Sequence, residues 1–277
     1  MNRLLIGTIL LSLVAFVVPA SLVVADDEPA NDALKRQADV SIKIFQKEFK
    51  SRKLGRKMNA ILSLSRIKHE LVIDELATRA LVDRNPEVRD ATAQLLGDMG
   101  ICVEKTGKYL KESLARNEKF PDVQVSIIRS IGKLKYKGAL EELKAAAKHL
   151  NEAKYQWVTV EVVTTFGVLE DPRCLPFLLW MSEYGGHALK WSTGSVSVDT
   201  GASGDTDARA AEAAWHAKYG HVKAKKPPAP VIRTYMQHLE KTVKKLTGQV
   251  FKNATEFRKW LVANAESLGL DPRKLSK

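Results

Sequence analysis

Cysteine is scarce in this chain, which has only Cys102 and Cys174 among its 277 residues. So low a count excludes the small secreted scaffolds that disulfides hold together. Common catalytic signatures are absent as well: the sequence has no H-E-x-x-H, no C-x-x-C and no Gly-rich phosphate loop, and its six histidines are scattered. We therefore expect no bound metal, no cofactor and no catalysis by the chain itself.

The N-terminal segment up to Ala25 carries almost no charge, with Arg3 as its only charged side chain. An apolar run from Leu4 to Val18 is followed by small residues up to Ala25, just before an acidic stretch. This layout is typical of a secretory signal peptide cleaved after Ala25. We expect an exported protein of the periplasm, the cell envelope or the medium. Cleavage after Ala20 and retention of the segment as a membrane anchor remain alternatives.

Acidic residues are outnumbered, with 32 Asp and Glu against 44 Lys and Arg and a formal net charge of +12 at pH 7. A basic balance often indicates nucleic-acid binding, but export would keep this chain away from nucleic acid. Acidic proteins or anionic polymers of the envelope are therefore the more suitable partners. A solvated basic face without a partner is the alternative.

Glycine recurs at a fixed interval, because Gly97, Gly132 and Gly167 are each 35 residues apart. Apolar residues flank each glycine at helical spacing, and a repeat of this length is typical of an α-solenoid. A helical glycine costs about 1 kcal/mol relative to alanine, so three in register indicate that neighbouring helices approach closely there. The pattern predicts helices at 38–51, 58–67, 70–81, 86–99, 103–115, 121–134, 139–150, 154–169 and 173–184.

Two motifs allow a comparison with a known family. Asn85-Pro86-Glu87-Val88-Arg89-Asp90-Ala91 opens one of these helices, and Asp171-Pro172-Arg173 precedes another. On these residues, segment 52–184 resembles the HEAT-repeat family. The resemblance implies an all-α fold, a right-handed α-solenoid of about four to five HEAT-like helix pairs, and a binding role without a particular ligand. Arg89 matches the family's basic position, whereas Gln124 and Thr159 replace it in the next two units.

The repeat also bears on the two cysteines. The separation between Cys102 and Cys174 is two repeat periods plus two positions. Helical layers advance by about 9–10 Å each, so these positions should lie about 20 Å apart. A disulfide needs Cα atoms within about 7 Å. We expect two buried, unpaired thiols.

The repeat pattern breaks at Gly185-Gly186. Residues 188–198 alternate with the period of a strand around a Gly turn, which predicts a small β-hairpin. Near the end, residues 247–251 and 257–260 are similar to the tail of exported, planctomycete-like bacterial HEAT-repeat proteins. The expected organisation is a signal peptide (1–25), a disordered lead-in (26–37), the solenoid (38–184), the hairpin with an Asp-rich loop and an Ala-rich helix (185–220), a Lys/Pro linker (221–230) and a two-helix tail (231–277).

The hairpin and its loop supply one set of candidate site residues. Trp191 is suited to anchor a partner because it is an aromatic residue on a predicted hairpin. The Asp-rich loop offers oxygen ligands for Ca²⁺, and helix capping is the alternative for its carboxylates. The partner-binding candidates here are Lys190, Trp191, Val196 and Val198, and the weak metal candidates are Asp199, Asp205 and Asp207.

The second candidate is the run from Lys43 to Lys57, which holds seven Lys or Arg and only one Glu. It is suited to an acidic or phosphate-rich partner, and a solvated helix face is the alternative. Its partner-binding candidates are Lys50, Arg52, Lys53, Arg56 and Lys57. We expect an exported protein-binding scaffold or adaptor. The alternatives are a lyase-like HEAT enzyme or enzyme accessory, and a binder of anionic polymers through this basic face.

Overall fold

The computed structural model describes residues 28–147, 153–186 and 229–275, and every regular element in these ranges is helical. The expected all-α fold is therefore confirmed. The predicted hairpin, Asp-rich loop and Ala-rich helix lie outside the described residues. The helices are α1 (Glu28–Phe49), α2 (Leu54–Ser65), α3 (Glu70–Glu75) with the π-helical turn η1 (Leu76–Ala80), α4 (Pro86–Met99), α5 (Val103–Arg116), α6 (Pro121–Lys133), α7 (Leu140–Ala146), α8 (Gln156–Leu169), α9 (Leu175–Gly186), α11 (Ala229–Thr247) and α12 (Ala254–Asn264).

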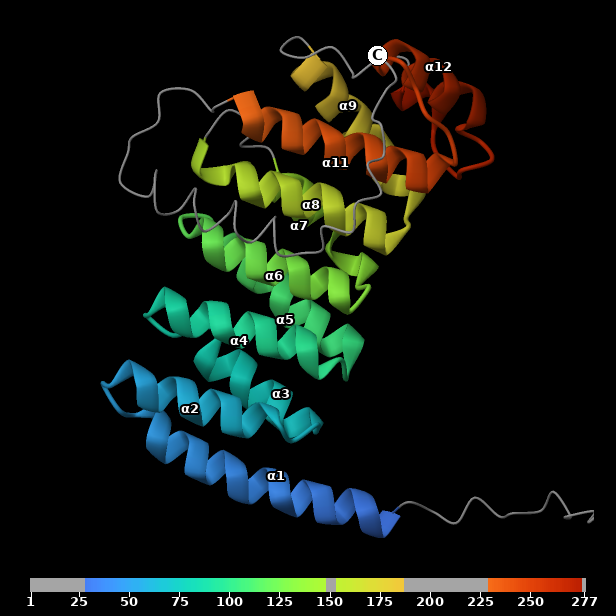
Figure 1. Ribbon diagram of the computed structural model, residues 1–277. Helices are drawn as coiled ribbons and strands as arrows, with labels where there is room; N and C mark the ends of the chain where they lie inside the picture. The colour runs from blue at the N-terminus through green and yellow to red at the C-terminus, as the bar shows by residue number, and fades with distance from the viewer. Residues whose placement is uncertain (1–27, 148–152, 187–228, 276–277) are drawn as a thin grey trace, which may run out of the picture.

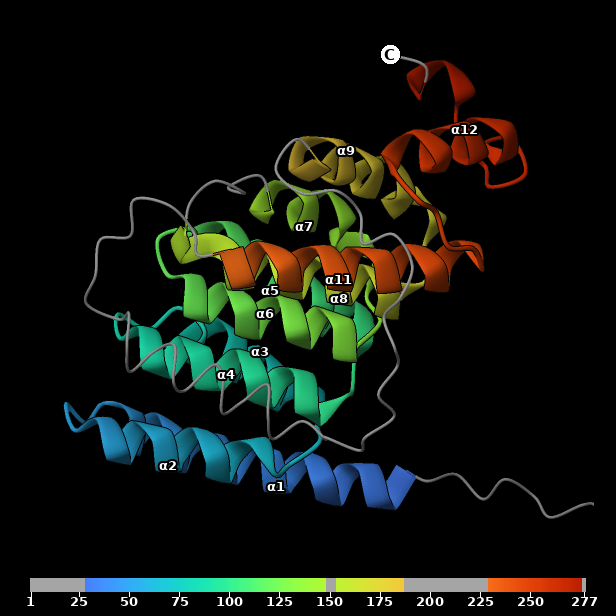
Figure 2. The same cartoon turned by 45° about the horizontal axis from the view of Figure 1, so that its top comes forward.

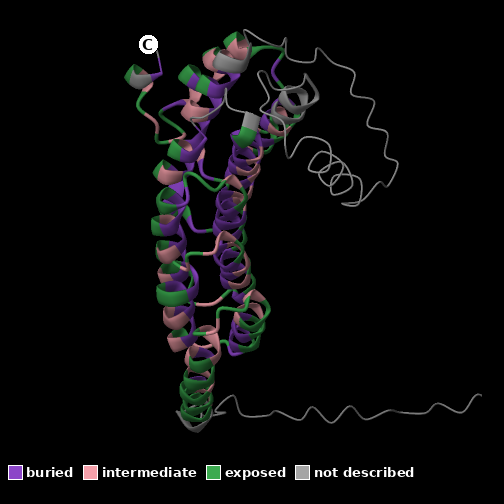
Figure 3. Ribbon diagram, turned by 90° about the vertical axis from the view of Figure 1, so that its left-hand side faces the viewer, coloured by how far each residue is buried: buried purple, intermediate pink, exposed green. Residues whose placement is uncertain are grey.

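These helices form two stacked rows (Figure 1). α2, α4, α6, α8 and α11 pack one upon the next in the first row. α3, α5, α7 and α9 form the second row behind it, and α1 covers one end of the stack by packing on α2 and α3. Buried residues line the facing sides of the two rows (Figure 3). The fully buried members of the core include Leu96, Ile127 and Phe166 of the first row and Leu76 and Leu110 of the second. Burial of this apolar surface is the main force that holds the rows together.

The glycines of the repeat lie where successive helices of the first row pack against each other. A Cβ atom on Gly97 would come within 2.5 Å of Ser130 Oγ and 2.8 Å of Ser130 Cα. A Cβ on Gly132 would lie 3.2 Å from Thr165 Oγ1. The prediction that these glycines permit close packing is confirmed, most sharply at Gly97.

α11 continues the first row beyond the last repeat that the sequence reveals. It lies along α8 (Figure 2), and Thr242 Oγ1 donates a hydrogen bond to Val163 O at 3.1 Å. The expected tail does contain two helices, but α11 belongs to the stacked rows and already begins at Ala229, inside the expected linker. Gly185 and Gly186, where the repeat pattern breaks, form the end of α9. Residues 187–228 are therefore inserted between two helices of the stack.

The N-terminal helix is longer than expected. α1 begins at Glu28, so the disordered lead-in predicted for 26–37 is wrong from that residue onward. Pro29 suggested an irregular segment, but it lies in the first turn of α1, where its missing N–H leaves no hydrogen bond unmade. Ala38 and Phe45 are buried beneath α1 and attach it to the stack.

A buried guanidinium connects successive units. Arg89 Nε donates to Asn117 Oδ1 at 2.7 Å, and Arg89 Nη1 donates to Asp83 O at 2.8 Å. Its guanidinium also lies 4.5 Å from the centre of the Phe120 ring. Desolvation lowers the pKa of Arg89, and the charge of Asp83 opposes that shift. The residues that replace Arg89 in the next two units, Gln124 and Thr159, are also buried.

Candidate partner-binding site

The turn between α1 and α2 concentrates positive charge. Three of its four residues, Lys50, Arg52 and Lys53, are basic. A helix N-terminus is usually stabilised by an acidic side chain or by a capping acceptor. α2 has neither, since Lys53 occupies its N-cap without a side-chain cap bond and its first turn contains no acidic residue. The helix dipole of α2 and these side chains therefore make the same region electropositive.

Most of the basic run lacks a carboxylate partner. Within the described part of the chain, no Asp or Glu lies within ion-pair distance of six exposed side chains, namely Lys43, Lys47, Lys50, Arg52, Lys53 and Arg56. Elsewhere in the rows, cations bind carboxylates of a neighbouring helix, as Lys133 does with Asp98 at 2.5 Å and Arg129 does with Glu161 at 2.9 Å. The α1–α2 end thus concentrates, within one short run of the chain, cations that have no carboxylate partner among the described residues.

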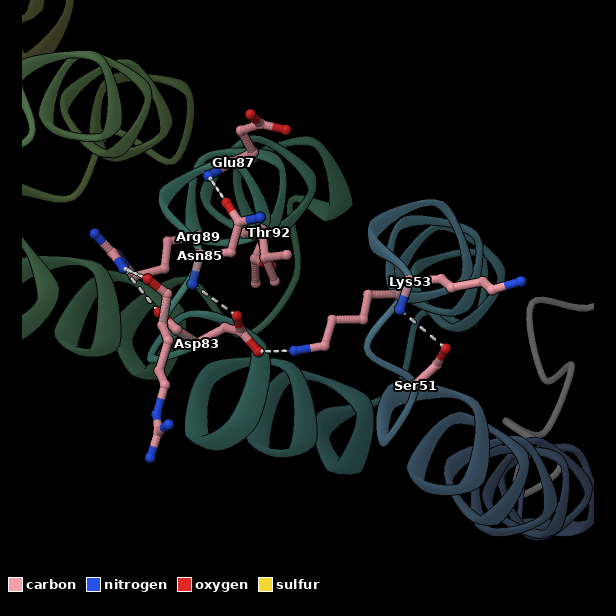
Figure 4. A network of polar contacts seen from close by, with 10 residues as sticks. Ser51, Lys53, Asp83, Asn85, Glu87, Arg89 and Thr92 are labelled. Carbon is pink, nitrogen blue, oxygen red and sulfur yellow. Dashed lines mark hydrogen bonds and ion pairs between the residues drawn. The ribbon is translucent and has the colours of Figure 1, made fainter.

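Lys57 is the exception in the basic run. Its ammonium lies 2.5 Å from Asp83 Oδ2 and 4.8 Å from the centre of the Phe49 ring. Asp83 Oδ1 in turn accepts a hydrogen bond from Asn85 N at 2.8 Å. Figure 4 shows this network, with the Lys53 side chain extending away from Asp83. Lys57 therefore joins α2 to the turn before α4, and its charge is occupied inside the protein.

An open groove of about 290 Å³ lies between α1 and α2, next to this cationic turn. Phe45 and Leu64 are buried beneath it, whereas Ile44 is exposed. Each helix contributes residues at i, i+3, i+4 and i+7 spacing, so one continuous face of α1 and one of α2 border the groove. The lining residues are Ser41, Ile44, Phe45, Glu48, Arg56, Asn59, Ala60, Ser63 and Leu64.

Two apolar residues of α1 point away from the core. Val40, Ile44 and Phe45 lie at i, i+4 and i+5 along α1, but only Phe45 is buried, while Val40 and Ile44 are 58% and 59% exposed. Phe45 belongs instead to a stripe with Ala38 and Phe49 at i, i+7 and i+11 spacing. This spacing separates Phe45 from Val40 and Ile44, and it was the available signal that those two residues form a second, outward apolar stripe. Sequence reasoning missed that signal.

A second polar cluster lies on α8 and α11, and its side chains bind one another or a side chain of a neighbouring helix. Thr164 Oγ1 and His238 Nδ1 are 3.0 Å apart, which joins the two helices. Burial lowers the pKa of His238, Lys241 lowers it further, and Glu161 raises it. Because Glu161 is held by Arg129, the cluster serves the packing of the row.

The remaining candidates from the sequence fall outside the described residues. These are Lys190, Trp191, Val196 and Val198 of the predicted hairpin and Asp199, Asp205 and Asp207 of the loop. Across 28–147, 153–186 and 229–275, no three His, Cys, Asp or Glu side chains are grouped as metal ligands would be. No helix in those ranges is both long and apolar enough to cross a membrane.

The two cysteines are unpaired, as expected, but only one is buried. Burial raises the pKa of the Cys174 thiol to about 12. Cys102 is exposed, so its expected burial is wrong. It precedes α5 with a φ of 47°, in a turn that places it outside the helical rows.

Comparison with known proteins assigns no family: no protein-family model matches the chain, and no curated protein matches it.

Proposed function

We propose that this chain is an exported, non-catalytic protein-binding scaffold, built as a right-handed HEAT-like α-solenoid, which takes its partner at the α1–α2 end. The 35-residue period supports the architecture because contacts between helices recur at that separation. Tyr109 Oη donates to Asp74 Oδ1 at 2.9 Å, and Lys133 binds Asp98, each across 35 residues. α11 adds a further first-row helix to the repeats that the sequence reveals.

The free cations of the basic run are the observation that carries the binding site. Six cations within 43–56 have no carboxylate partner among the described residues, and the run contains a single acidic residue, Glu48. Such a cluster attracts an acidic surface over about a Debye length, which speeds association and orients the partner. The apolar groove beside it offers the short-range contacts that hold a protein partner. An anionic polymer is a second candidate partner, since the same cations would bind its negative charges without any contact from the groove.

Affinity capture from an envelope extract tests this function. The bait is the full chain after removal of the expected signal peptide, compared with Arg52→Glu/Arg56→Glu and with a matched control, Lys108→Glu/Lys119→Glu. Like Arg52 and Arg56, the two control lysines are exposed and form no ion pair with the described residues. Each variant replaces two cations with two glutamates, so both variants change the net charge equally. We expect the first variant to lose the captured protein and the second to retain it.

Three results would change the assignment. Equal capture by both variants would remove the α1–α2 end as the site. Loss of capture in Trp191→Ala alone would place the site on the predicted hairpin. Recovery of glycan or nucleic acid without protein would favour the anionic-polymer function.

A further inference from the structure

The α1–α2 groove has the composition of a surface on which one more helix could pack. Its two walls are antiparallel neighbouring helices at the end of the stack (Figure 1). Ser41, Ala60 and Ser63 are small side chains along the lining, which let an incoming helix approach the backbone closely. Phe45 and Leu64 form the apolar floor beneath them.

The outward face of α1 is unusual for the end of a helical stack. Terminal units of such stacks normally carry a polar outer face, which keeps the protein soluble. Here Val40 and Ile44, one helical turn apart, are each more than half exposed. Ile44 also lines the groove, so the exposed apolar pair begins at the groove lining and continues onto the outer surface of α1.

Charge sets the chemistry of the occupant. Arg56 and Glu48 line the groove at the end nearest the cationic turn, where Lys50, Arg52 and Lys53 also lie and outnumber that one carboxylate. An occupant must therefore present carboxylates toward this end and apolar side chains toward Ile44. A second copy of this chain fits poorly at the turn, because it would bring the same cations face to face.

We propose that the α1–α2 groove binds an acidic amphipathic helix of a partner protein, with its apolar stripe on Val40 and Ile44 and its carboxylates on Arg52 and Arg56. This inference rests on the proposed scaffold function and names its partner chemistry. Helix-in-groove recognition uses apolar anchors at i, i+3, i+4 and i+7, which is the spacing of the groove walls. A membrane surface suits the site less well, since the groove is concave and the aromatic Phe45 is turned into the core.

A direct binding measurement with synthetic probes tests the inference. The probe is a fluorescein-labelled peptide of about 18 residues, five helical turns, with a leucine stripe on one face and glutamates elsewhere. A scrambled peptide of the same composition, polyglutamate, and vesicles of anionic phospholipid are the comparisons. The full chain is measured alongside Ile44→Ser, Arg52→Glu/Arg56→Glu, and Val103→Ser as a control at another exposed apolar residue.

We expect the amphipathic peptide to bind the full chain and the scrambled peptide to bind at least about tenfold more weakly. Ile44→Ser should raise Kd by about tenfold, as loss of an interface anchor does, while Val103→Ser should leave it unchanged. Arg52→Glu/Arg56→Glu should also raise Kd, and added salt should shrink the difference from the unaltered chain. Because Ile44 is exposed, the variant's circular dichroism and Tm should match those of the unaltered chain.

The inference is overturned if the scrambled peptide or polyglutamate binds as well as the amphipathic one, if Ile44→Ser has no effect, or if only the vesicles bind. These outcomes separate it from the scaffold function. Unchanged peptide binding by Ile44→Ser, together with lost envelope capture by Arg52→Glu/Arg56→Glu, would remove the helix partner and keep the scaffold. Retention of both activities by both variants would remove the two proposals together.

Discussion

Thr242 of α11 faces Gly167 of α8, and a Cβ atom on that glycine would lie 3.1 Å from the Thr242 hydroxyl. Thr165 has the same relation to Gly132, at 3.2 Å. Gly132 and Thr165 lie in consecutive units of the repeat, whereas Gly167 and Thr242 lie on opposite sides of the inserted segment 187–228. One packing rule therefore spans the first row from α4 onward, including the helix that follows the inserted segment.

Replacing Gly97 with alanine should destabilise the protein. Its Cβ would contact the backbone of Ser130 as well as its hydroxyl, so α4 and α6 must move apart. We expect a loss of about 1–3 kcal/mol in the free energy of unfolding, measured by urea titration. Gly55→Ala is the control: nothing lies within 4 Å of that position, so helix propensity alone should make it neutral or stabilising. Equal losses in the two variants would show that Gly97 has no packing role.

Removing a buried hydroxyl should have opposite effects at two positions of the first row. In the described structure Thr159 Oγ1 is buried and has no hydrogen-bond partner, whereas Thr242 Oγ1 donates to Val163 O. Valine keeps the shape and removes the hydroxyl, so Thr159→Val should stabilise the protein and Thr242→Val should destabilise it, each by about 1 kcal/mol. Thermal unfolding of both variants measures the signs. A lower Tm for Thr159→Val would mean that its hydroxyl is satisfied in solution.

The two thiols should react at different rates because one is exposed to solvent and the other is buried. Cys102 is exposed and should react promptly with a thiol reagent at pH 8. Cys174 is buried and its raised pKa leaves almost no thiolate at that pH, so it should react only after unfolding. Thiol titration before and after denaturation, without reductant, should count one group and then two. Two rapid reactions in the folded protein would contradict the burial of Cys174.

Asp171 should make stability depend on acid pH. Arg173 holds the pKa of this carboxyl below its ordinary value of 3.8, through Nη2 at 2.6 Å and a backbone N–H at 3.0 Å. Because the folded pKa is depressed, the carboxylate stabilises the protein above pH 3.8, and that contribution is lost as the pH falls through the folded pKa. Asp171→Asn should therefore be less stable than the unaltered chain at pH 7, with the gap closing below pH 3.8. A gap that is constant across this range would exclude the linkage.

Local signals in the sequence were sufficient for much of the stack. Asn85 and Pro86 define where α4 begins, and the predicted helix 86–99 matches it at both ends. α11 could not be assigned to the row in the same way, because segment 187–228 interrupts the period before it and only tertiary packing places it on α8. The start of α1 was missed since Pro29 is compatible with either a first helical turn or an irregular lead-in.

The candidate site was predictable in its charge but not in its shape. The basic run between Lys43 and Lys57 is evident in the sequence, yet the separate role of Lys57 depends on Asp83, 26 residues away. The outward direction of Val40 and Ile44 depends on which stripe of α1 packs against α2 and α3. Periodicity alone does not choose between two overlapping apolar stripes, and burial of Phe45 decides it.

Hydrogen exchange of the full chain, with and without its captured partner, tests the central claim most directly. The partner should slow exchange at backbone amides of α1 and α2 around the groove, from about residue 38 to residue 64, and leave α5 to α8 unchanged. Protection confined to other segments, with α1 and α2 exchanging as in the free protein, would contradict binding at the α1–α2 end.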